Sequence, residues 1–455
     1  PASVSVCAGI NTSLTVGAVG TNLSYKWQKQ SGSLWNDVPG ATTATLSFSP
    51  ANSGDAGNYH CVVHGVCGPD ITSVAASLTV NPCLSAPQVV CVMDISGSMK
   101  RDFNGSYYQP QNTWRISYSK TALHAFAEIA YENGTAKYGL VSFPGSAGYC
   151  SANENYSMND LTAANYNDPT TGISISIDNL NPGGGTPLLA GLEKAKDMLL
   201  ASGTSGKKAI VLLSDGAHNC PNQITNYTTD PVYVPLIQTM VDNNIRVFTL
   251  AFGNSGEVDK PLLSDIASKT AGLFYDVTNI SGKSATGTPG EGVAASDWDP
   301  GLALAGAYSD ILEDWLDFDY DEDPIGSIAK GASHNFDVQV SPSDSKVTFF
   351  VNWVDDKVNN LKVRIITSNG TELPQNHPAI QYIHRNKYTI ITVSEGFLNS
   401  TGVVGSAPWQ LQINADDING SSEKFQYIVM SKPDKFRFKT WSDKRWYYTD
   451  RKSVV

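Results

Sequence analysis

Hydrophobic and polar positions follow different patterns in three successive parts of the chain. From residue 1 to 82, short alternating runs such as TSLTVGAVG and GNYHCVVHG are separated by Gly, Ser, Asn and Pro. From residue 86 to about 316, continuous apolar runs alternate with segments of helical periodicity. From about residue 325 the strict alternation returns. Alternation predicts half-buried strands, whereas short continuous apolar runs predict strands that are covered on both faces.

The middle part predicts a doubly wound α/β sheet. Four apolar runs, PQVVCVMD, KYGLVSFP, KKAIVLLSD and NIRVFTLAF, alternate with helical patterns at about 113–131, 187–201, 232–243 and 261–270. Such alternation gives a mostly parallel sheet with helices on both faces. We therefore expect a multidomain protein, with a β-sandwich, then a Rossmann-like doubly wound α/β domain, then a second β-sandwich.

The predicted domain boundaries follow these changes of pattern. They are a β-sandwich at 1–82, the α/β domain at 83–318, a C-terminal β-sandwich at 319–431 and a basic, aromatic tail at 432–455. Basic residues interleaved with aromatic ones are also found in nucleic-acid-binding segments. Because KFRFKTW alternates as a strand does, we prefer a docking strand for another subunit or domain.

Composition narrows the classes of partner. Of the 455 residues, 41% are hydrophobic and 16% are charged, as in a globular protein. The net charge of -12 argues against nucleic acid or an anionic membrane surface as the main partner. No apolar stretch reaches the roughly 18 residues that a membrane span requires.

Five oxygen-bearing side chains are predicted to meet at one edge of the α/β sheet. Asp94, Ser96 and Ser98 follow the first apolar run, Thr186 precedes a helix, and Asp215 ends the third run. Ligands of such sheets bind at the carboxyl ends of the strands. Two carboxylates and three hydroxyls favour a hard cation, with Mg²⁺ first and Mn²⁺ or Ca²⁺ as alternatives. Taken singly, the serines could shape a turn and the second aspartate could cap a helix.

The order D-x-S-x-S, then Thr, then Asp resembles a von Willebrand factor A (VWA) domain with an intact metal-ion-dependent adhesion site, over about residues 86–316. The resemblance implies that Ser96, Ser98 and Thr186 contact the metal, and that Asp94 and Asp215 balance its charge. It also implies that an acidic group of a partner completes the coordination sphere, and that a shift of the last helix modulates affinity.

The flanking parts show looser resemblances. DAGNYHC, which ends at Cys61, together with Trp27, resembles the immunoglobulin-like modules of bacterial surface proteins. Val16 stands where such modules keep a second core cysteine, so we do not expect the usual disulfide. The part from residue 325 resembles the domains that follow the A domain in calcium-activated chloride channel regulators and bacterial surface proteins.

Two other pairs of cysteines are disulfide candidates. Cys7 and Cys67 would tie the first strand of the first domain to a hairpin, and this is our preferred pairing there. Cys150 and Cys220 lie in two loops at the metal-binding edge and would stiffen it. Cys91 lies in a buried strand and is expected to be a free core residue. Paired cysteines in loops point to a compartment outside the reducing cytosol.

These features predict an extracellular or cell-surface adhesion or ligand-binding protein that depends on a divalent cation. The metal would bridge the VWA domain to an acidic group on a protein or glycan partner. The alternative is a structural subunit of a cell-surface filament or appendage that assembles through its β-sandwiches and tail. We expect no enzymatic activity, because the sequence contains no H-E-x-x-H, no G-x-S-x-G and no phosphate loop, and the metal-binding set includes no separate base.

Overall fold

The computed structural model of the chain forms two compact units, Pro1–Ser85 and Ala86–Val455, and each is described by itself. The residues that the structure describes are 1–7, 11–66, 68–81, 86–107, 109–133, 136–146, 148, 150–203, 206–220, 223–224, 226–254, 256–279, 299–316, 319–322, 325–341, 344–358, 360–400, 403–405 and 407–433. Cys67 and the tail from residue 434 lie outside these ranges, and so the predicted Cys7–Cys67 pair does too.

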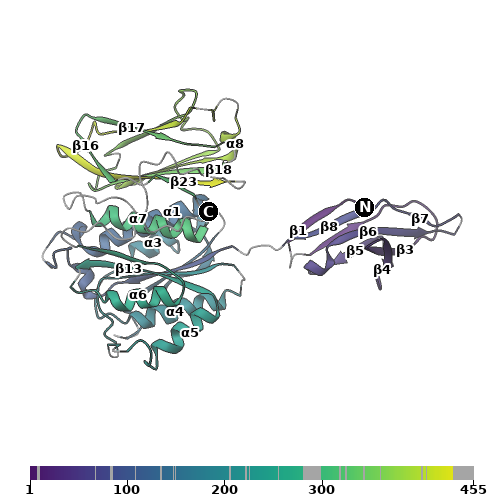
Figure 1. The fold of residues 1–455 in the computed structure, drawn as a ribbon, viewed down its shortest axis with the longest axis horizontal. Helices are drawn as coiled ribbons and strands as arrows, with labels where there is room; N and C mark the ends of the chain where they lie inside the picture. Colours follow the sequence, from purple (N-terminus) through teal and green to yellow (C-terminus); the bar gives the residue numbers. More distant parts are fainter. Residues whose placement is uncertain are drawn as a thin grey trace. The chain divides into compact units, whose positions relative to one another are not determined.

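The first unit contains two sheets, one with the order β1-β8-β6-β3-β4 and with β7 paired to β6, and one that pairs β2 with β5 (Figure 1). Both sheets contribute to one core, in which Trp27 and Cys61 are fully buried. The Cys61 thiol is free. The strands are β1 (Val4–Cys7), β2 (Thr12–Thr15), β3 (Ser24–Ser31), β4 (Leu34–Asp37), β5 (Thr45–Phe48), β6 (Gly57–His64), β7 (Ile71–Thr72) and β8 (Ala76–Asn81).

The second unit begins with a six-stranded sheet of order β11-β10-β9-β12-β13-β14. All neighbours pair in parallel except β10 and the edge strand β11. Every residue of the inner strand β9 is buried, because helices cover both faces of the sheet. The strands are β9 (Gln88–Asp94), β10 (Lys137–Phe143), β11 (Asn153–Asp160), β12 (Lys208–Ser214), β13 (Ile245–Asn254) and β14 (Phe274–Asn279).

The helices divide between the two faces of this sheet (Figure 1). Residues of α1 (Arg115–Asn133), α3 (Ile173–Asp178) and α7 (Pro300–Leu316) share one core with Val89, Cys91 and Met93 of β9. Residues of α4 (Leu188–Ala201), α5 (Tyr233–Asp242) and α6 (Lys260–Lys269) share the other core with Val90 and Val92. The apolar run of β9 therefore serves two cores at alternate positions, which explains why it is continuous.

The C-terminal part of the second unit contains a sheet of order β15-β23-β18-β21-β20, with β16 paired to β23, and a sheet of order β17-β22-β19. Residues of both sheets meet in one core that includes Phe349 and Trp409. The rings of these two residues are stacked, with their centroids 6.3 Å apart. The elements are β15 (Asp319–Glu322), β16 (Ile325–Ala329), β17 (Ser333–Val338), β18 (Asp344–Trp353), β19 (Lys362–Ile366), β20 (Ile380–His384), β21 (Tyr388–Ser394), α8 (Glu395–Leu398), β22 (Trp409–Asn414) and β23 (Ser422–Pro433).

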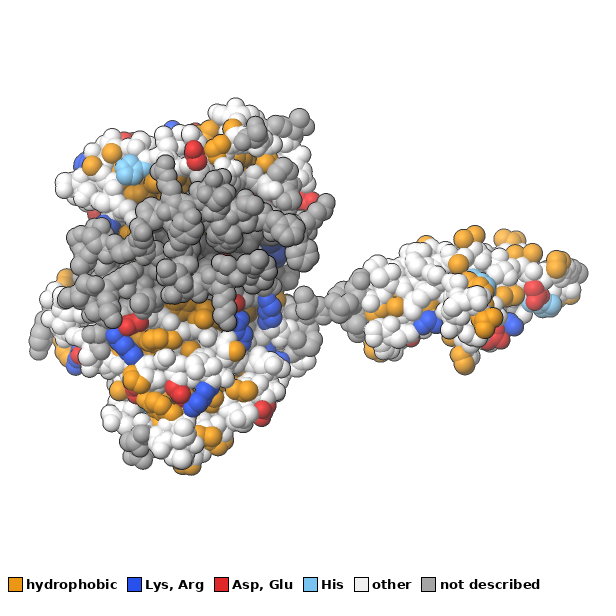
Figure 2. Space-filling model, in the orientation of Figure 1, with side chains coloured by type: hydrophobic (Ala, Val, Ile, Leu, Met, Phe, Trp, Pro, Cys, Tyr) orange, Lys and Arg blue, Asp and Glu red, His pale blue; other side chains and the backbone are white. Residues whose placement is uncertain are grey.

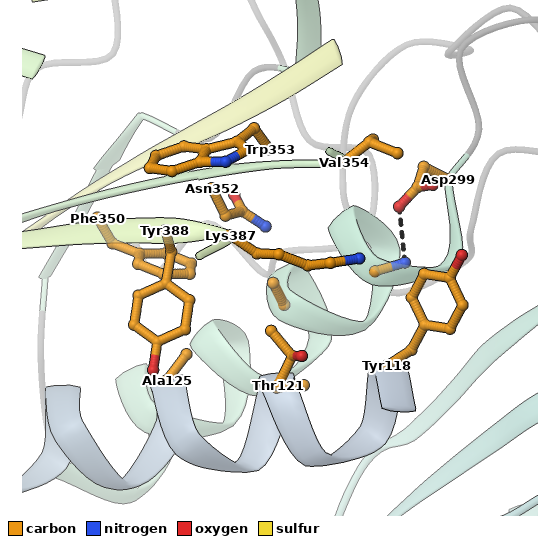
Figure 3. Close-up of a pocket in the computed structure, with 13 residues that line it drawn as sticks. Tyr118, Thr121, Ala125, Asp299, Phe350, Asn352, Trp353, Val354, Lys387 and Tyr388 are labelled. Carbon is orange, nitrogen blue, oxygen red and sulfur yellow. Dashed lines mark hydrogen bonds between the residues drawn. The ribbon is translucent and has the colours of Figure 1, made fainter. Parts of the chain in front are cut away.

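The α/β sheet and the C-terminal sheets belong to one compact unit because they share a core. Phe350 and Ile428 lie in the same apolar cluster as residues of α1 and α7. Glu128 of α1 is fully buried at this junction, where it accepts hydrogen bonds from Arg385 Nε at 2.9 Å and Tyr388 Oη at 2.7 Å. A small cavity of about 20 Å³ remains between α1, the start of α7 and the sheet above them (Figure 3). Across the described residues, no helix is long and apolar enough to cross a membrane.

Candidate metal centre

The predicted ligands lie at the carboxyl edge of the parallel sheet. Asp94 is the last residue of β9, Asp215 directly follows β12, and Thr186 lies just before α4. Ser96 and Ser98 lie in the turn after β9, where the short 3-10 helix η2 (Gly97–Lys100) begins. This edge is where open α/β sheets bind ligands.

Direct contacts join four of the five predicted residues. Ser98 Oγ donates to Asp215 Oδ1 at 2.7 Å and lies 2.9 Å from Ser96 Oγ. Asp94 Oδ1 accepts from the backbone N–H of Ser96 at 2.8 Å. Asp94 Oδ2 accepts from the hydroxyl of Ser214, the last residue of β12, at 2.7 Å. The turn after β9 and the end of β12 are therefore held together by the predicted residues.

Thr186 is fixed to the same edge through backbone contacts. The N–H of Gly97 donates to the carbonyl of Gly184 at 3.0 Å, which ties the Thr186 loop to the serine turn. Thr186 N–H donates to Asn219 Oδ1 at 2.8 Å, and Asn219 N–H donates back to the Thr186 carbonyl at 3.2 Å. Asn219 follows β12, so this reciprocal pair of hydrogen bonds connects the loop that carries Thr186 to the loop that follows Asp215.

Gly216 keeps open the space between the threonine and serine hydroxyls. A methyl group at Gly216 would lie 3.2 Å from Thr186 Oγ1 and 3.9 Å from Ser98 Oγ. The first distance is tighter than most real contacts of a Cβ atom, so any larger side chain would press on the threonine hydroxyl. The residues present thus leave room beside the Thr186 and Ser98 hydroxyls. With Ser96, Asp94 and Asp215 at the same edge, the three hydroxyls and two carboxylates form a donor set that suits Mg²⁺.

The two carboxylates are buried and need a compensating charge. Asp94 and Asp215 have no exposed side-chain surface, and Ser96 and Thr186 are nearly as buried. Burial, reinforced by the charge of Asp215, raises the pKa of Asp94 above its ordinary range. Burial also raises the pKa of Asp215, although the Arg115 charge opposes this shift. A bound cation would stabilise both ionised groups, because buried charges persist when they are paired or coordinate metals.

Arg115, the first residue of α1, is a member of this site that the sequence did not reveal. Its fully buried guanidinium donates from Nη1 to Asp215 Oδ2 at 2.7 Å. It also contacts Glu257 Oε2 at 2.9 Å and donates from Nε to the Asp102 carbonyl at 3.1 Å. Gly253 lies so close that a Cβ there would come within 2.8 Å of Arg115 Nε. The one available signal was periodicity, since Arg115 falls on the buried stripe of its helix.

A partly exposed cation lies on the loop next to the site. Arg101 pairs with Glu257, and its guanidinium lies 4.3 Å above the ring of Tyr107. The Tyr107 side chain is 46% exposed, so it is available for contact with a partner. This loop belongs to the polar, Tyr-rich segment that follows the serine turn.

A disulfide joins Cys150 to Cys220, with the two Cα atoms 5.4 Å apart. Cys220 is next to Asn219, so the bond links the loop after β10 to the residue that holds Thr186. Cys91 is free and fully buried in β9, where burial raises the pKa of its thiol to about 12. Within the described part of the chain, no group of three or more His, Cys, Asp or Glu side chains is placed to hold a metal. Coordination at this edge would therefore rest on hydroxyls together with two carboxylates.

Comparison with known proteins identifies the α/β part of the chain. Residues 88–286 match the family model of the von Willebrand factor type A domain, so this part of the chain is a VWA domain. A comparison with curated proteins gives no match.

Several solved structures are similar to the chain at low identity. The PilB minor pilin from Streptococcus sanguinis is 16% identical, with 65% of this chain and 88% of that chain covered and a TM-score of 0.35. The pilus adhesin SpaC from Lactobacillus rhamnosus GG is 12% identical, with 92% of this chain and 44% of that chain covered and a TM-score of 0.36. Proximal thread matrix protein 1 from the mussel byssus is 14% identical, with 55% and 50% covered and a TM-score of 0.32.

Proposed function

We propose that the chain is an extracellular adhesion or ligand-binding protein whose VWA domain uses an intact metal-ion-dependent adhesion site. Asp94, Ser96, Ser98, Thr186 and Asp215 would hold Mg²⁺, with Mn²⁺ or Ca²⁺ as alternatives. The observation that carries this proposal is the convergence of hydroxyls and buried carboxylates around the space beside Gly216, at the carboxyl edge of the sheet.

The residues have distinct parts in this proposal. The hydroxyls of Ser96, Ser98 and Thr186 supply neutral oxygen ligands. Asp94 is oriented by Ser96 N–H and Ser214 Oγ, and Asp215 is oriented by Arg115, so neither carboxylate has to be reorganised when a cation binds. When bound, the ion would supply a Lewis-acidic position for an oxygen of the partner.

The charges around the site support an acidic ligand. With both aspartates ionised, Asp94, Asp215 and Glu257 would supply three negative charges against the two positive charges of Arg115 and Arg101, so the group would have a net charge of about one negative unit. A divalent cation would convert this to about one positive unit in a buried setting. A carboxylate on a protein or glycan partner would neutralise it, and oppositely charged groups attract more strongly where water is excluded.

Two further features support the proposed setting. A disulfide at the rim of the site fits an oxidising compartment outside the cell. For the first unit we propose an immunoglobulin-like module, supported by the buried Trp27 and by the hydrogen bond from Tyr59 Oη to the Asp55 carbonyl at 2.6 Å. We propose binding rather than catalysis, because Arg115, Ser214 and Asn219, which contact the proposed ligands, hold those ligands in place.

Calorimetric titration of Mg²⁺, Mn²⁺ and Ca²⁺ into the chelator-treated chain tests the proposal. We expect saturable binding of Mg²⁺ or Mn²⁺ that is lost in Asp94→Ala. Asp197→Ala is the matched control, because Asp197 is an exposed carboxylate on α4 that pairs with Lys196. Absence of binding in the unmodified chain, or equal binding in Asp94→Ala, would reject a functional metal centre.

One observation favours the alternative of a structural subunit in a surface filament. Hydrophobic side chains are exposed at several places on the first unit (Figure 2). A groove of about 500 Å³ in this unit is lined mainly by apolar residues. Val19 and Val66, which line it, are 104% and 66% exposed. Sedimentation velocity with and without chelator separates the two functions, because self-assembly that persists in chelator and is lost in Val66→Ser would support the filament subunit.

A further inference from the structure

A polar groove runs along the free edge of the VWA sheet and shares no residue with the candidate metal centre. It has a volume of about 560 Å³, within the range of about 300 to 1,000 Å³ that is common for small-molecule sites. One wall is the edge strand β11, and the other is formed by α2 (Ala163–Asn167), α3 and the loop between them.

Two irregularities in β11 shape the first wall. Leu140 pairs with Tyr156 and Val141 pairs with Glu154, so Asn155 is an extra residue in the edge strand. A second register shift lies nearer the end of the strand, between the partners of Tyr138 and Leu140. Bulges of this kind redirect side chains and are frequent at sheet edges and beside binding sites. As a result, the consecutive residues Asn155, Tyr156 and Ser157 all line the groove.

The lining has the chemistry of a site for an uncharged, hydroxyl-rich ligand. Amide and hydroxyl side chains dominate it, including Asn159, Asn165, Thr170 and Asn179. Asp168 is the one charged residue among the described residues that line the groove. Side-chain amides can donate and accept at once, as sugar hydroxyls do, whereas an anionic ligand would require cationic side chains.

Asp168 is a rigid acceptor within this lining. Its Oδ1 accepts from Thr170 N–H at 2.9 Å, Thr170 Oγ1 at 2.9 Å and Thr171 N–H at 2.8 Å. These hydrogen bonds, led by those from the backbone N–H groups of Thr171 and Thr170, lower the pKa of Asp168 to about 2. The carboxylate therefore stays ionised and oriented at any physiological pH, which makes it a strong acceptor for a ligand hydroxyl.

Asn155 supplies an acceptor that nothing in the described structure satisfies. Its Oδ1 is buried, and it has no hydrogen-bond partner among the described residues. Most buried polar atoms in proteins have a hydrogen-bond partner, and an exception requires an explanation. Because this atom has almost no accessible surface, a ligand hydroxyl in the groove would provide the missing donor once the Asn155 side chain turns toward the groove.

We infer that this groove binds a neutral saccharide. Asn155 and Asp168 accept hydrogen bonds from sugar hydroxyls, and the surrounding amides and hydroxyls select a ligand without charge. The groove is separate from the candidate metal centre, because the two share no residue. A test of saccharide binding in the groove can therefore succeed or fail independently of a test of the proposed cation-dependent function.

Saturation-transfer NMR in the presence of excess chelator tests the inference on the full chain. The probes are the methyl glycosides of glucose, galactose, mannose, N-acetylglucosamine and N-acetylgalactosamine at about 10 mM, which detects dissociation constants in the millimolar range. At least one glycoside is expected to receive saturation. Absence of transfer to all five, or transfer that appears only after Mg²⁺ is added, would overturn the inference.

Variants locate the binding. Asn155→Leu and Asn179→Ala are expected to weaken it by about tenfold and about threefold, since each removes hydrogen-bonding groups from the lining. Asn179 is exposed, so its substitution is informative even if Asn155→Leu disturbs the edge strand. Asn112→Ala, an exposed change on the 3-10 helix η3 (Gln111–Thr113), is the matched control and should bind normally. Unchanged binding in both groove variants would place the saccharide elsewhere and reject this site.

Discussion

The guanidinium of Arg115 donates to Asp215 Oδ2 at 2.7 Å, and neither side chain is exposed to solvent. The other oxygen of the same carboxylate accepts from Ser98 at 2.7 Å. Arg115 thus fixes which oxygen of Asp215 faces the candidate metal centre. It also supplies the charge that allows two aspartates to be buried near each other.

Substitution of Arg115 by Met should be strongly destabilising. It leaves Asp215 and Glu257 without their shared counter-charge, and removing one partner of a buried ion pair costs about 3 to 5 kcal/mol. Urea unfolding in chelator measures the effect. Arg364→Met is the control, because the Arg364–Glu372 pair is partly exposed and should contribute less than about 1 kcal/mol. Similar losses for both substitutions would show that the buried pair has no special role.

Gly216→Ala should weaken Mg²⁺ binding by at least about tenfold, equivalent to about 1.4 kcal/mol, while the metal-free chain keeps most of its stability. The added methyl group would lie 3.2 Å from Thr186 Oγ1 and press on one of the proposed ligands. Gly183→Ala is a matched control in the neighbouring loop, because nothing lies within 4 Å of its added Cβ. Calorimetry of both variants gives the comparison, and equal affinity in the two would mean that Gly216 does not define the metal-binding space.

Removal of the Cys150–Cys220 disulfide should lower both stability and metal affinity. The bond closes a loop with a sequence separation of 70 residues, for which chain-entropy arguments give about 4 kcal/mol. Because Cys220 is next to Asn219, the double variant Cys150→Ala/Cys220→Ala should also loosen Thr186. Thermal unfolding and Mg²⁺ titration of the variant measure the two effects. A variant with unchanged Mg²⁺ affinity would separate the disulfide from the metal centre.

The stability of the second unit should depend on pH through Asp299. Burial raises the pKa of this carboxyl from its ordinary 3.8, although its Oδ1 accepts from Gly301 N–H and Leu302 N–H at the start of α7 (Figure 3). A raised folded-state pKa favours the protonated form in the folded chain. The resulting stabilisation is complete below pH 3.8 and is lost as the pH rises through the folded-state value.

Asp299→Asn keeps an oxygen for the helix cap but cannot ionise. We therefore expect the stability of the unmodified chain to fall relative to Asp299→Asn as the pH rises from about 4 to 7. Urea unfolding at several pH values measures this difference. A constant difference between the two proteins would contradict the assignment of the pH dependence to Asp299.

The sequence predicted the strands and helices whose pattern is dominated by burial. β9, β10, β12 and β13 appear where continuous apolar runs predicted them, because each is covered on both faces. β11 was not among the predicted strands. It lies at the sheet edge, and its bulges break the alternation that would have revealed a strand. The local pattern of hydrophobic and polar residues therefore predicts the inner strands of this sheet better than its edge strand.

The meeting of the proposed metal ligands at one edge of the sheet was predictable, because the order of strands brings their loops there. The contacts that hold them could not be predicted in the same way. Arg115 reaches Asp215 across 100 positions of sequence, and Asn219 holds Thr186 across 33. Such pairs depend on which side chains meet after the helices pack on the sheet, and that information is not local.

Strand β9 also determines how the second unit would carry tension. A pull transmitted through the chain from the first unit enters the second unit at Ala86 and passes into β9. Parallel hydrogen bonds to β10 and β12 hold this strand on both sides, so a force along it would shear many bonds together. Asp94 is at the far end of the same strand. Strand β9 therefore links the point where force enters the second unit, at Ala86, directly to the proposed metal-binding and partner-binding site at Asp94.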